Sequence, residues 1–102
     1  MLAFEALRLK NDQLELNVIA LVKDPCEKKM TVFIDSLQIW NEAFQVLVSN
    51  TDEQLHGLVL EMKELFDRFG AVIAARDWMI LSDLILFELS PFITKIGQAL
   101  GV

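Results

Sequence analysis

The sequence is poor in the residue types on which cross-linking and catalysis depend. Its 102 residues include one cysteine, one histidine and no tyrosine. A single cysteine cannot form a disulfide within the chain, which fits a reducing compartment, and we therefore expect a cytoplasmic location. With one histidine and no tyrosine there is little equipment for general acid–base catalysis. We therefore expect a protein that is not an enzyme and that carries no cofactor.

Basic residues are also scarce, with 9 Lys and Arg against 15 Asp and Glu, a formal net charge of −6 at pH 7. Nucleic acids and anionic membranes both bind clusters of basic side chains, so we expect neither as a partner. Charged residues such as Lys29, Asp35 and Glu88 interrupt every apolar run well short of the about 20 residues of a membrane span. No basic region followed by an apolar core opens the sequence, and we expect no secretory signal.

Apolar residues, in contrast, are in excess. They make up 54% of the chain, whereas about 45–50% is usual for globular proteins. A chain of this length forms one domain, which we place at residues 1–102, with a single modest core. The excess therefore predicts apolar surface that is covered by another molecule.

A strong helix start opens the segment 25–49. Asp24 offers an N-cap carboxylate, Pro25 fits the first helical position, and Glu27 completes the signal. The residues predicted to face the core recur at helical spacing: Met30, Phe33, Ile34, Leu37, Trp40, Phe44 and Leu47. A second apolar row, Val32, Ile39 and Val46, recurs every seven residues on the opposite side, which again indicates a covered outer face.

The next helix is predicted over residues 52–75. The sequence Thr51–Gln54 has the pattern of a capping box, in which Thr51 is the N-cap. Gly70 interrupts the helical pattern at a cost of about 1 kcal/mol in helix propensity, and we attribute it to a close helix crossing. The predicted apolar stripe is the cleanest in the chain: Leu55, Leu58, Val59, Met62, Leu65, Phe66, Phe69, Val72 and Ile73.

The last helix, predicted over residues 78–99 with Asp77 as its cap, is apolar on two sides. One side carries Trp78, Leu81, Ile85, Leu89, Phe92 and Ile96, and the other carries Ile80, Leu84 and Phe87. Such a helix is either packed between two neighbours in its own bundle or covered by another molecule. Pro91 predicts a kink near Phe87–Pro91 rather than an end, because the stripe continues beyond it.

Residues 1–22 admit two interpretations. As a helix they place Leu7, Leu14, Val18 and Leu21 on one side, interrupted by Asn11; as a hairpin, apolar and polar residues alternate around Asn11–Asp12. Leu, Glu and Ala favour the helix. The predicted fold is therefore all-α, an antiparallel bundle of three long helices plus an N-terminal helix, with a short N-terminal β-hairpin as the alternative.

Two positions are candidate chemical sites. Glu53 and His56 have the spacing of a di-iron carboxylate–histidine pair, but such sites need a second pair, and His56 falls beside Lys63, away from the apolar stripe. Cys26 lies at the start of a helix, where the dipole lowers a thiol pKa, yet no histidine or second cysteine supports it. We expect no metal site, a solvated histidine and an unreactive thiol.

The pattern of helices resembles that of small acidic helical bacterial proteins of the flagellar and type III export chaperone kind. The chain also resembles uncharacterised helical-bundle proteins whose last helix reads like Asp77–Trp78, Leu81, Asp83–Leu84, Glu88–Leu89 and Pro91. The resemblance covers residues 28–96 and rests on size, acidity and this helix. It implies a non-enzymatic protein that sheathes an apolar segment of a partner protein, and it carries over no individual binding residue.

The leading functional hypothesis is a helical interaction module, a homodimer or the holder of a partner's amphipathic helix. The residues expected at the interface are Ile80, Leu84, Phe87, Val32, Ile39 and Val46. The alternative is a helical bundle that binds a small molecule or a metal.

Overall fold

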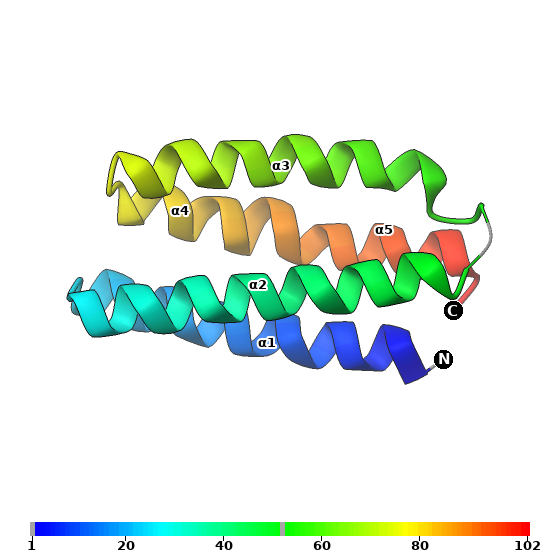
Figure 1. Cartoon of the computed structure of the whole chain (residues 1–102), viewed down its shortest axis with the longest axis horizontal. Helices are drawn as coiled ribbons and strands as arrows, with labels where there is room; N and C mark the ends of the chain where they lie inside the picture. Colours follow the sequence, from blue (N-terminus) through cyan, green and yellow to red (C-terminus); the bar gives the residue numbers. More distant parts are fainter. Residues whose placement is uncertain (1, 52) are drawn as a thin grey trace.

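The computed structural model describes residues 2–51 and 53–102, and these contain helices and turns but no strand. The all-α prediction is confirmed, and the alternative N-terminal hairpin has no support because those residues lie within the first helix. In Figure 1 the helices lie side by side as rods, and the chain reverses its direction at each turn. The elements are α1 (Leu2–Lys23), α2 (Glu27–Ser49), α3 (His56–Ala74), α4 (Trp78–Leu84), the π-helical η1 (Ile85–Leu89) and α5 (Ser90–Leu100).

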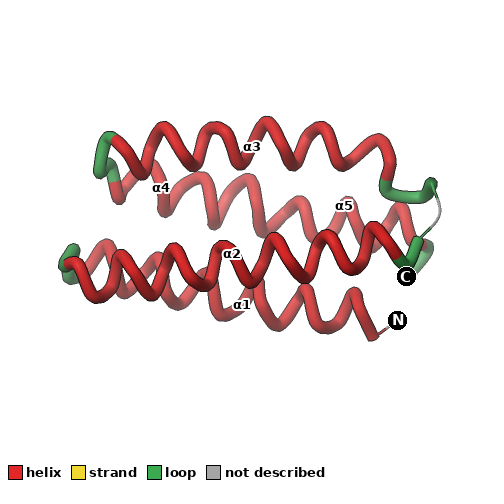
Figure 2. The backbone as a smooth tube through the Cα atoms, viewed as in Figure 1, coloured by secondary structure: helices red, strands yellow, loops and turns green. Residues whose placement is uncertain are grey.

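The rods have similar lengths, and the loops that join them lie at the two ends of the molecule (Figure 2). The molecule measures 40 × 23 × 19 Å along its principal axes. None of the helices in the described part of the chain combines the length and the apolar character needed to cross a membrane.

α1 buries one side along its whole length. The buried residues are three or four apart, which is the spacing of one side of an α-helix; they are Phe4, Leu7, Asn11, Leu14, Val18 and Leu21. Asn11, which interrupts the apolar pattern in the sequence, is nevertheless inside the bundle and only 6% exposed. Its polar side chain must therefore find hydrogen-bond partners in the core.

The start of α2 corrects the prediction that Asp24 is its N-cap. α2 begins at Glu27, and Cys26 is at the N-cap with an extended backbone. Pro25 disfavours a helical conformation of the residue before it, so the helix starts after the proline. The Asp24 carboxylate instead forms an ion pair with Lys29 Nζ at 3.3 Å.

The start of α3 also differs from the prediction. α3 begins at His56, several residues later than expected, and Leu55 is at the N-cap; Asp52 of the predicted capping box lies outside the described residues. The Thr51 hydroxyl donates to the Leu47 carbonyl oxygen at 3.0 Å. Thr51 thus satisfies a free carbonyl at the end of α2 instead of an amide of α3.

α4, η1 and α5 form one continuous rod (Figure 1). Asp77 caps it as predicted, because its Oδ1 accepts a hydrogen bond from the Ile80 amide at 3.1 Å. Near Pro91, where the sequence predicts a kink, the helix passes through the π-helical segment η1 and then continues. The rod adapts its hydrogen bonding locally to a residue that lacks an amide hydrogen.

Aromatic side chains occupy the centre of the core. The ring of Trp40 stacks on Phe44 at 5.6 Å and lies 5.7 Å from that of Phe66, and Phe44 meets the edge of Phe92 at 6.3 Å. These contacts join α2, α3 and α5. The backbone of α3 comes close mainly to that of α4, so large side chains fill the wider space between α3 and α2.

The expected close crossing at Gly70 is wrong. Gly70 is exposed, and no atom lies within 4 Å of the position that a β-carbon would take there. The close approach occurs instead at Gly97 of α5, where a β-carbon would lie 3.1 Å from Phe4 Cζ of α1.

Candidate partner-binding surface

A chain of hydrogen bonds, buried at Trp40 and part-buried at Ser90 and Glu15, fixes how α1, α2 and α5 face one another. The indole Nε1 of Trp40 donates to Asn11 Oδ1 at 3.0 Å, and Asn11 Nδ2 donates to Ser90 Oγ at 3.0 Å. The Ser90 hydroxyl in turn donates to Glu15 Oε2 at 2.6 Å. Because every link needs both partners in place, the chain of bonds fixes the register of the three helices.

This network is complete within the protein. In the described part of the chain, no buried side-chain nitrogen or oxygen lacks a hydrogen-bond partner. A site for a small molecule usually keeps some inward polar groups free to orient it. The geometry of this network therefore supports a structural role, and the candidate functional surface lies on the outside of the bundle.

The second apolar row of α2 lies at the surface, on the side predicted from the sequence. Val32, Ile39 and Val46 are 46%, 44% and 55% exposed. A spacing of seven residues places them along one line of the helix. Over fourteen residues at 1.5 Å each, the row is about 21 Å long.

α1 carries a matching row that sequence reasoning missed. Leu2, Leu9 and Leu16 are 90%, 64% and 63% exposed, and they too are spaced by seven. They project from the side of α1 opposite its core residues such as Leu7 and Leu14. The repeat itself was the available signal, but the same leucines also fit the alternation of a hairpin.

The two rows belong to one face of the molecule. Val48 lines a pocket with residues of α3, so this flank of α2 is turned toward α3. The opposite flank of α2 is therefore turned toward α1, and it carries Ser36 and Ala43. Val32 and Ile39 each precede one of these two residues by four positions and lie on the same flank. We call the surface formed by Leu2, Leu9, Leu16, Val32, Ile39 and Val46 the α1–α2 outer face.

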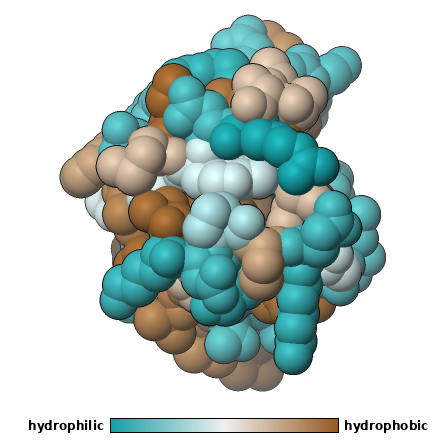
Figure 3. Space-filling model, turned by 90° about the vertical axis from the view of Figure 1, so that its left-hand side faces the viewer, coloured by the Kyte–Doolittle hydropathy of each residue, from teal (hydrophilic) through white to brown (hydrophobic). Residues whose placement is uncertain are grey.

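The rows also match in register. α1 and α2 run in opposite directions (Figure 1), and the Trp40–Asn11 bond sets their alignment. This alignment places Leu9 within about one helical turn of Ile39. In Figure 3, which shows one end of the bundle, hydrophobic residues reach the lower edge, the side where Figure 1 places α1 and α2.

Charged residues border both rows on the outside. Four of the six residues three positions after the row members are exposed carboxylates, Glu5 and Asp12 on α1 and Asp35 and Glu42 on α2; the other two are Ile19 and Ser49. Glu5 lines a pocket beside α5, so this edge of α1 is turned away from α2. On α2 the acidic edge lies across the row from the buried Ser36. The apolar face is thus framed by two acidic edges.

The three interface residues predicted on the last helix differ in their exposure to solvent. Ile80 and Phe87 are 48% and 71% exposed, but Leu84 is 5% exposed and belongs to the core. The placement of Leu84 on an outer face is therefore wrong. The rod that contains α4 packs against both α1 and α3, so it buries two of its sides within the monomer.

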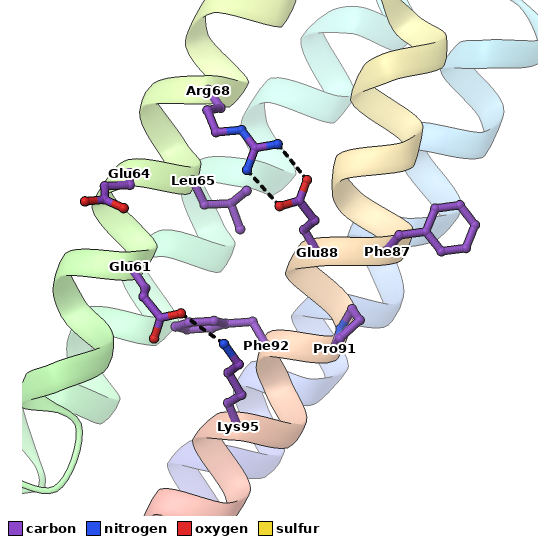
Figure 4. Close-up of a pocket in the computed structure, with 9 residues that line it drawn as sticks. All are labelled: Glu61, Glu64, Leu65, Arg68, Phe87, Glu88, Pro91, Phe92 and Lys95. Carbon is purple, nitrogen blue, oxygen red and sulfur yellow. Dashed lines mark hydrogen bonds and ion pairs between the residues drawn. The ribbon is translucent and has the colours of Figure 1, made fainter.

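A groove of about 360 Å³ runs between α3 and the rod of η1 and α5. Figure 4 shows Arg68 reaching from α3 to Glu88, with both guanidinium–carboxylate contacts at 2.7 Å, and Lys95 reaching Glu61 at 3.0 Å. The hydrogen bonds and the charge of Glu88 raise the pKa of the Arg68 guanidinium. Phe87 points to the other side of its helix, away from α3. Arg68, Glu88, Lys95 and Glu61 are thus paired with one another across this groove, and Glu64 points away from them.

The two candidate chemical sites lie on the surface. Cys26 is an exposed free thiol next to the start of α2, and His56 is the exposed first residue of α3, lining a pocket with Lys63 as the sequence suggested. No group of three or more His, Cys, Asp or Glu side chains placed to hold a metal occurs among residues 2–51 and 53–102.

No protein-family model, curated protein or solved structure matches this chain.

Proposed function

We propose that this protein is a non-enzymatic helical interaction module, a homodimer or the holder of a partner's amphipathic helix in the manner of a chaperone. Its binding surface is the α1–α2 outer face, where apolar burial drives association. A cytoplasmic location and partners other than nucleic acid or membrane belong to the same proposal.

One observation carries the proposal: six large apolar side chains stand in two matched rows on the outside of regular helices. Leaving one such side chain in water instead of burying it forgoes about 1.5–3 kcal/mol. Scattered exposed apolar residues are common, but apolar residues aligned in rows on adjacent helices are an arrangement typical of interaction sites. The spacing of seven within each row is that of helix–helix packing.

The rigid scaffold beneath the rows supports the same interpretation. The Trp40–Asn11 hydrogen bond and the extensive α1–α2 contact hold the two rows in fixed relation. A surface that is already ordered loses little conformational freedom on binding, so more of the apolar burial is available as affinity.

Sedimentation velocity of the full chain, together with retention of proteins from an extract of its native host, tests the proposal. The substitution Ile39→Glu places a charge in the middle of the face, and Leu60→Glu makes the same kind of change at an exposed residue of α3. We expect wild type and Leu60→Glu to form the same dimer or to retain the same partner, and Ile39→Glu to lose it. A wild-type chain that stays monomeric and retains nothing beyond what Ile39→Glu retains would contradict the proposal.

A further inference from the structure

The acidic edges of the α1–α2 outer face indicate what kind of molecule covers it. We propose that its occupant is an amphipathic helix of a partner protein whose apolar side is flanked by Lys and Arg. This inference rests on the proposed function and goes further, because it chooses between a second copy of the chain and a different protein.

The edges are acidic on both sides. Asp12 borders the α1 row, and Asp35 and Glu42 border the α2 row; all three are exposed. No ion pair joins any of the three to a basic group in the described part of the chain, whereas the fourth edge residue, Glu5, pairs with Arg8 at 3.1 Å. These carboxylates are therefore available to basic groups from outside.

A helix lying along the face would meet both edges. Its apolar side would cover the two rows, and the residues on either side of that stripe would lie next to the edges, as the flanking positions of a coiled coil do. Lys and Arg at those positions would pair with the carboxylates, while Glu and Asp would be repelled. The length of the α2 row, about 21 Å, matches a helix of about 14 residues.

A second copy fits this charge pattern less well. In a two-fold dimer the same patch of each protomer meets itself. Two α1–α2 outer faces brought together would therefore set acidic edges against acidic edges. Of the five basic residues of α1 and α2, Arg8 and Lys29 already pair with Glu5 and Asp24, and Lys23 lies at the end of α1. Lys10 lies on the other side of the α1 row from Asp12, and Lys28 falls in line with the α2 row, so neither stands on an acidic edge. Charge complementarity thus favours a basic partner over self-association.

The test uses the full chain and two synthetic peptides of about 18 residues with the heptad pattern of an amphipathic helix. Both carry the same leucines on the apolar side; one has Lys and Arg at the flanking positions and the other has Glu. Fluorescence anisotropy is measured at concentrations where each peptide alone is monomeric. We expect the basic peptide to bind at least about tenfold more tightly than the acidic one, and the difference to shrink at high salt.

Variants of the chain locate the binding. The edge variant Asp35→Lys/Glu42→Lys should lose about tenfold in affinity for the basic peptide and gain for the acidic one. The control Asp67→Lys/Asp83→Lys makes the same change in net charge at exposed residues of α3 and α4, and it should bind both peptides as wild type does. Circular dichroism verifies that each variant is folded.

The outcomes separate this inference from the proposed function. Equal binding of the two peptides, or an equal loss in the edge and control variants, would overturn the basic-helix proposal. A wild-type dimer that Ile39→Glu dissociates, with neither peptide binding, would identify a second copy as the occupant and leave the interaction module intact. A monomer that binds neither peptide and retains no partner would contradict both.

Discussion

Trp40 and Asn11, from adjacent helices, meet in the core, where the indole Nε1 donates a 3.0 Å hydrogen bond to Asn11 Oδ1. Trp40 is fully buried and Asn11 nearly so. This bond, continued through Ser90, is the polar link that aligns α1 with α2 and therefore aligns the two rows of the α1–α2 outer face.

Removing both partners of this bond should cost less than the two single losses added together. Trp40→Phe leaves Asn11 Oδ1 without its donor, and we expect a loss of about 1–3 kcal/mol in unfolding free energy. Asn11→Leu leaves the Trp40 indole without its acceptor, while Ser90 keeps its bond to Glu15, and the change should cost a similar amount. The double variant should lose less than the sum, with a coupling of about 0.5–3 kcal/mol in urea denaturation. Additive losses would show that the bond contributes nothing of its own.

Leu84 and Phe87, which the sequence places together, should respond differently to substitution. Leu84→Ala should destabilise the protein by about 2–5 kcal/mol, because Leu84 is buried in the core. Phe87→Ser should change stability by no more than about 0.5 kcal/mol, because its ring is largely exposed. Thermal unfolding followed by circular dichroism measures both. Equal losses at the two positions would contradict the structural assignment of Leu84.

The aspartates before α2 and α4 should also differ. Asp77→Ala removes the acceptor of the Ile80 amide and should cost about 0.5–2 kcal/mol. Asp24→Ala removes an exposed ion pair with Lys29 and should cost about 0.2–1 kcal/mol. Chemical denaturation of both variants checks the order. If Asp24→Ala proves the costlier change, Asp24 acts as a cap in solution.

Alanine substitutions at two helical glycines, Gly70 and Gly97, should change stability in opposite directions. Gly70→Ala should stabilise the protein by about 0.5–1 kcal/mol, because the site is open and alanine is the better helix former. Gly97→Ala should lose that gain or reverse it, because its methyl group would press on the Phe4 ring at 3.1 Å. The denaturation midpoints of the two variants give the comparison. A stabilising Gly97→Ala would mean that the Phe4 ring moves aside freely.

Helical periodicity was sufficient to find the helices and most of the core. Residues such as Phe33, Trp40 and Phe44 recur at the spacing of one helix face, and they are buried as predicted. Asp77 was recognised as a cap because its carboxylate has no competing partner. Thr51 was misassigned because its hydroxyl can satisfy either an amide ahead of it or a carbonyl behind it, and the sequence does not say which.

The candidate surface was predicted only in part, for a related reason. A helical wheel shows which residues share a side of one helix but not which neighbours cover that side. Leu84 is buried because its rod packs between α1 and α3, and this arrangement depends on the whole bundle. The α2 row follows from the sequence because the helix at residues 25–49 has a strong start signal. The leucines of the α1 row fit both a helix and a hairpin, so the sequence does not place them on one side of a helix.

The loose attachment of α3 has a consequence for how the molecule opens. The backbone of α3 comes close mainly to α4, and its contacts with η1 and α5 include exposed ion pairs such as Arg68–Glu88. Several of its apolar residues, among them Leu58 and Val72, remain partly exposed. Local opening should therefore begin there, and amide hydrogens of α3 should exchange with deuterium before those of α1.

Detachment of α3 would bring Trp40 into water and shift its fluorescence, while α1 and α2 kept their pairing. Uniform exchange across α1 and α3 would mean instead that the four rods separate in one cooperative step.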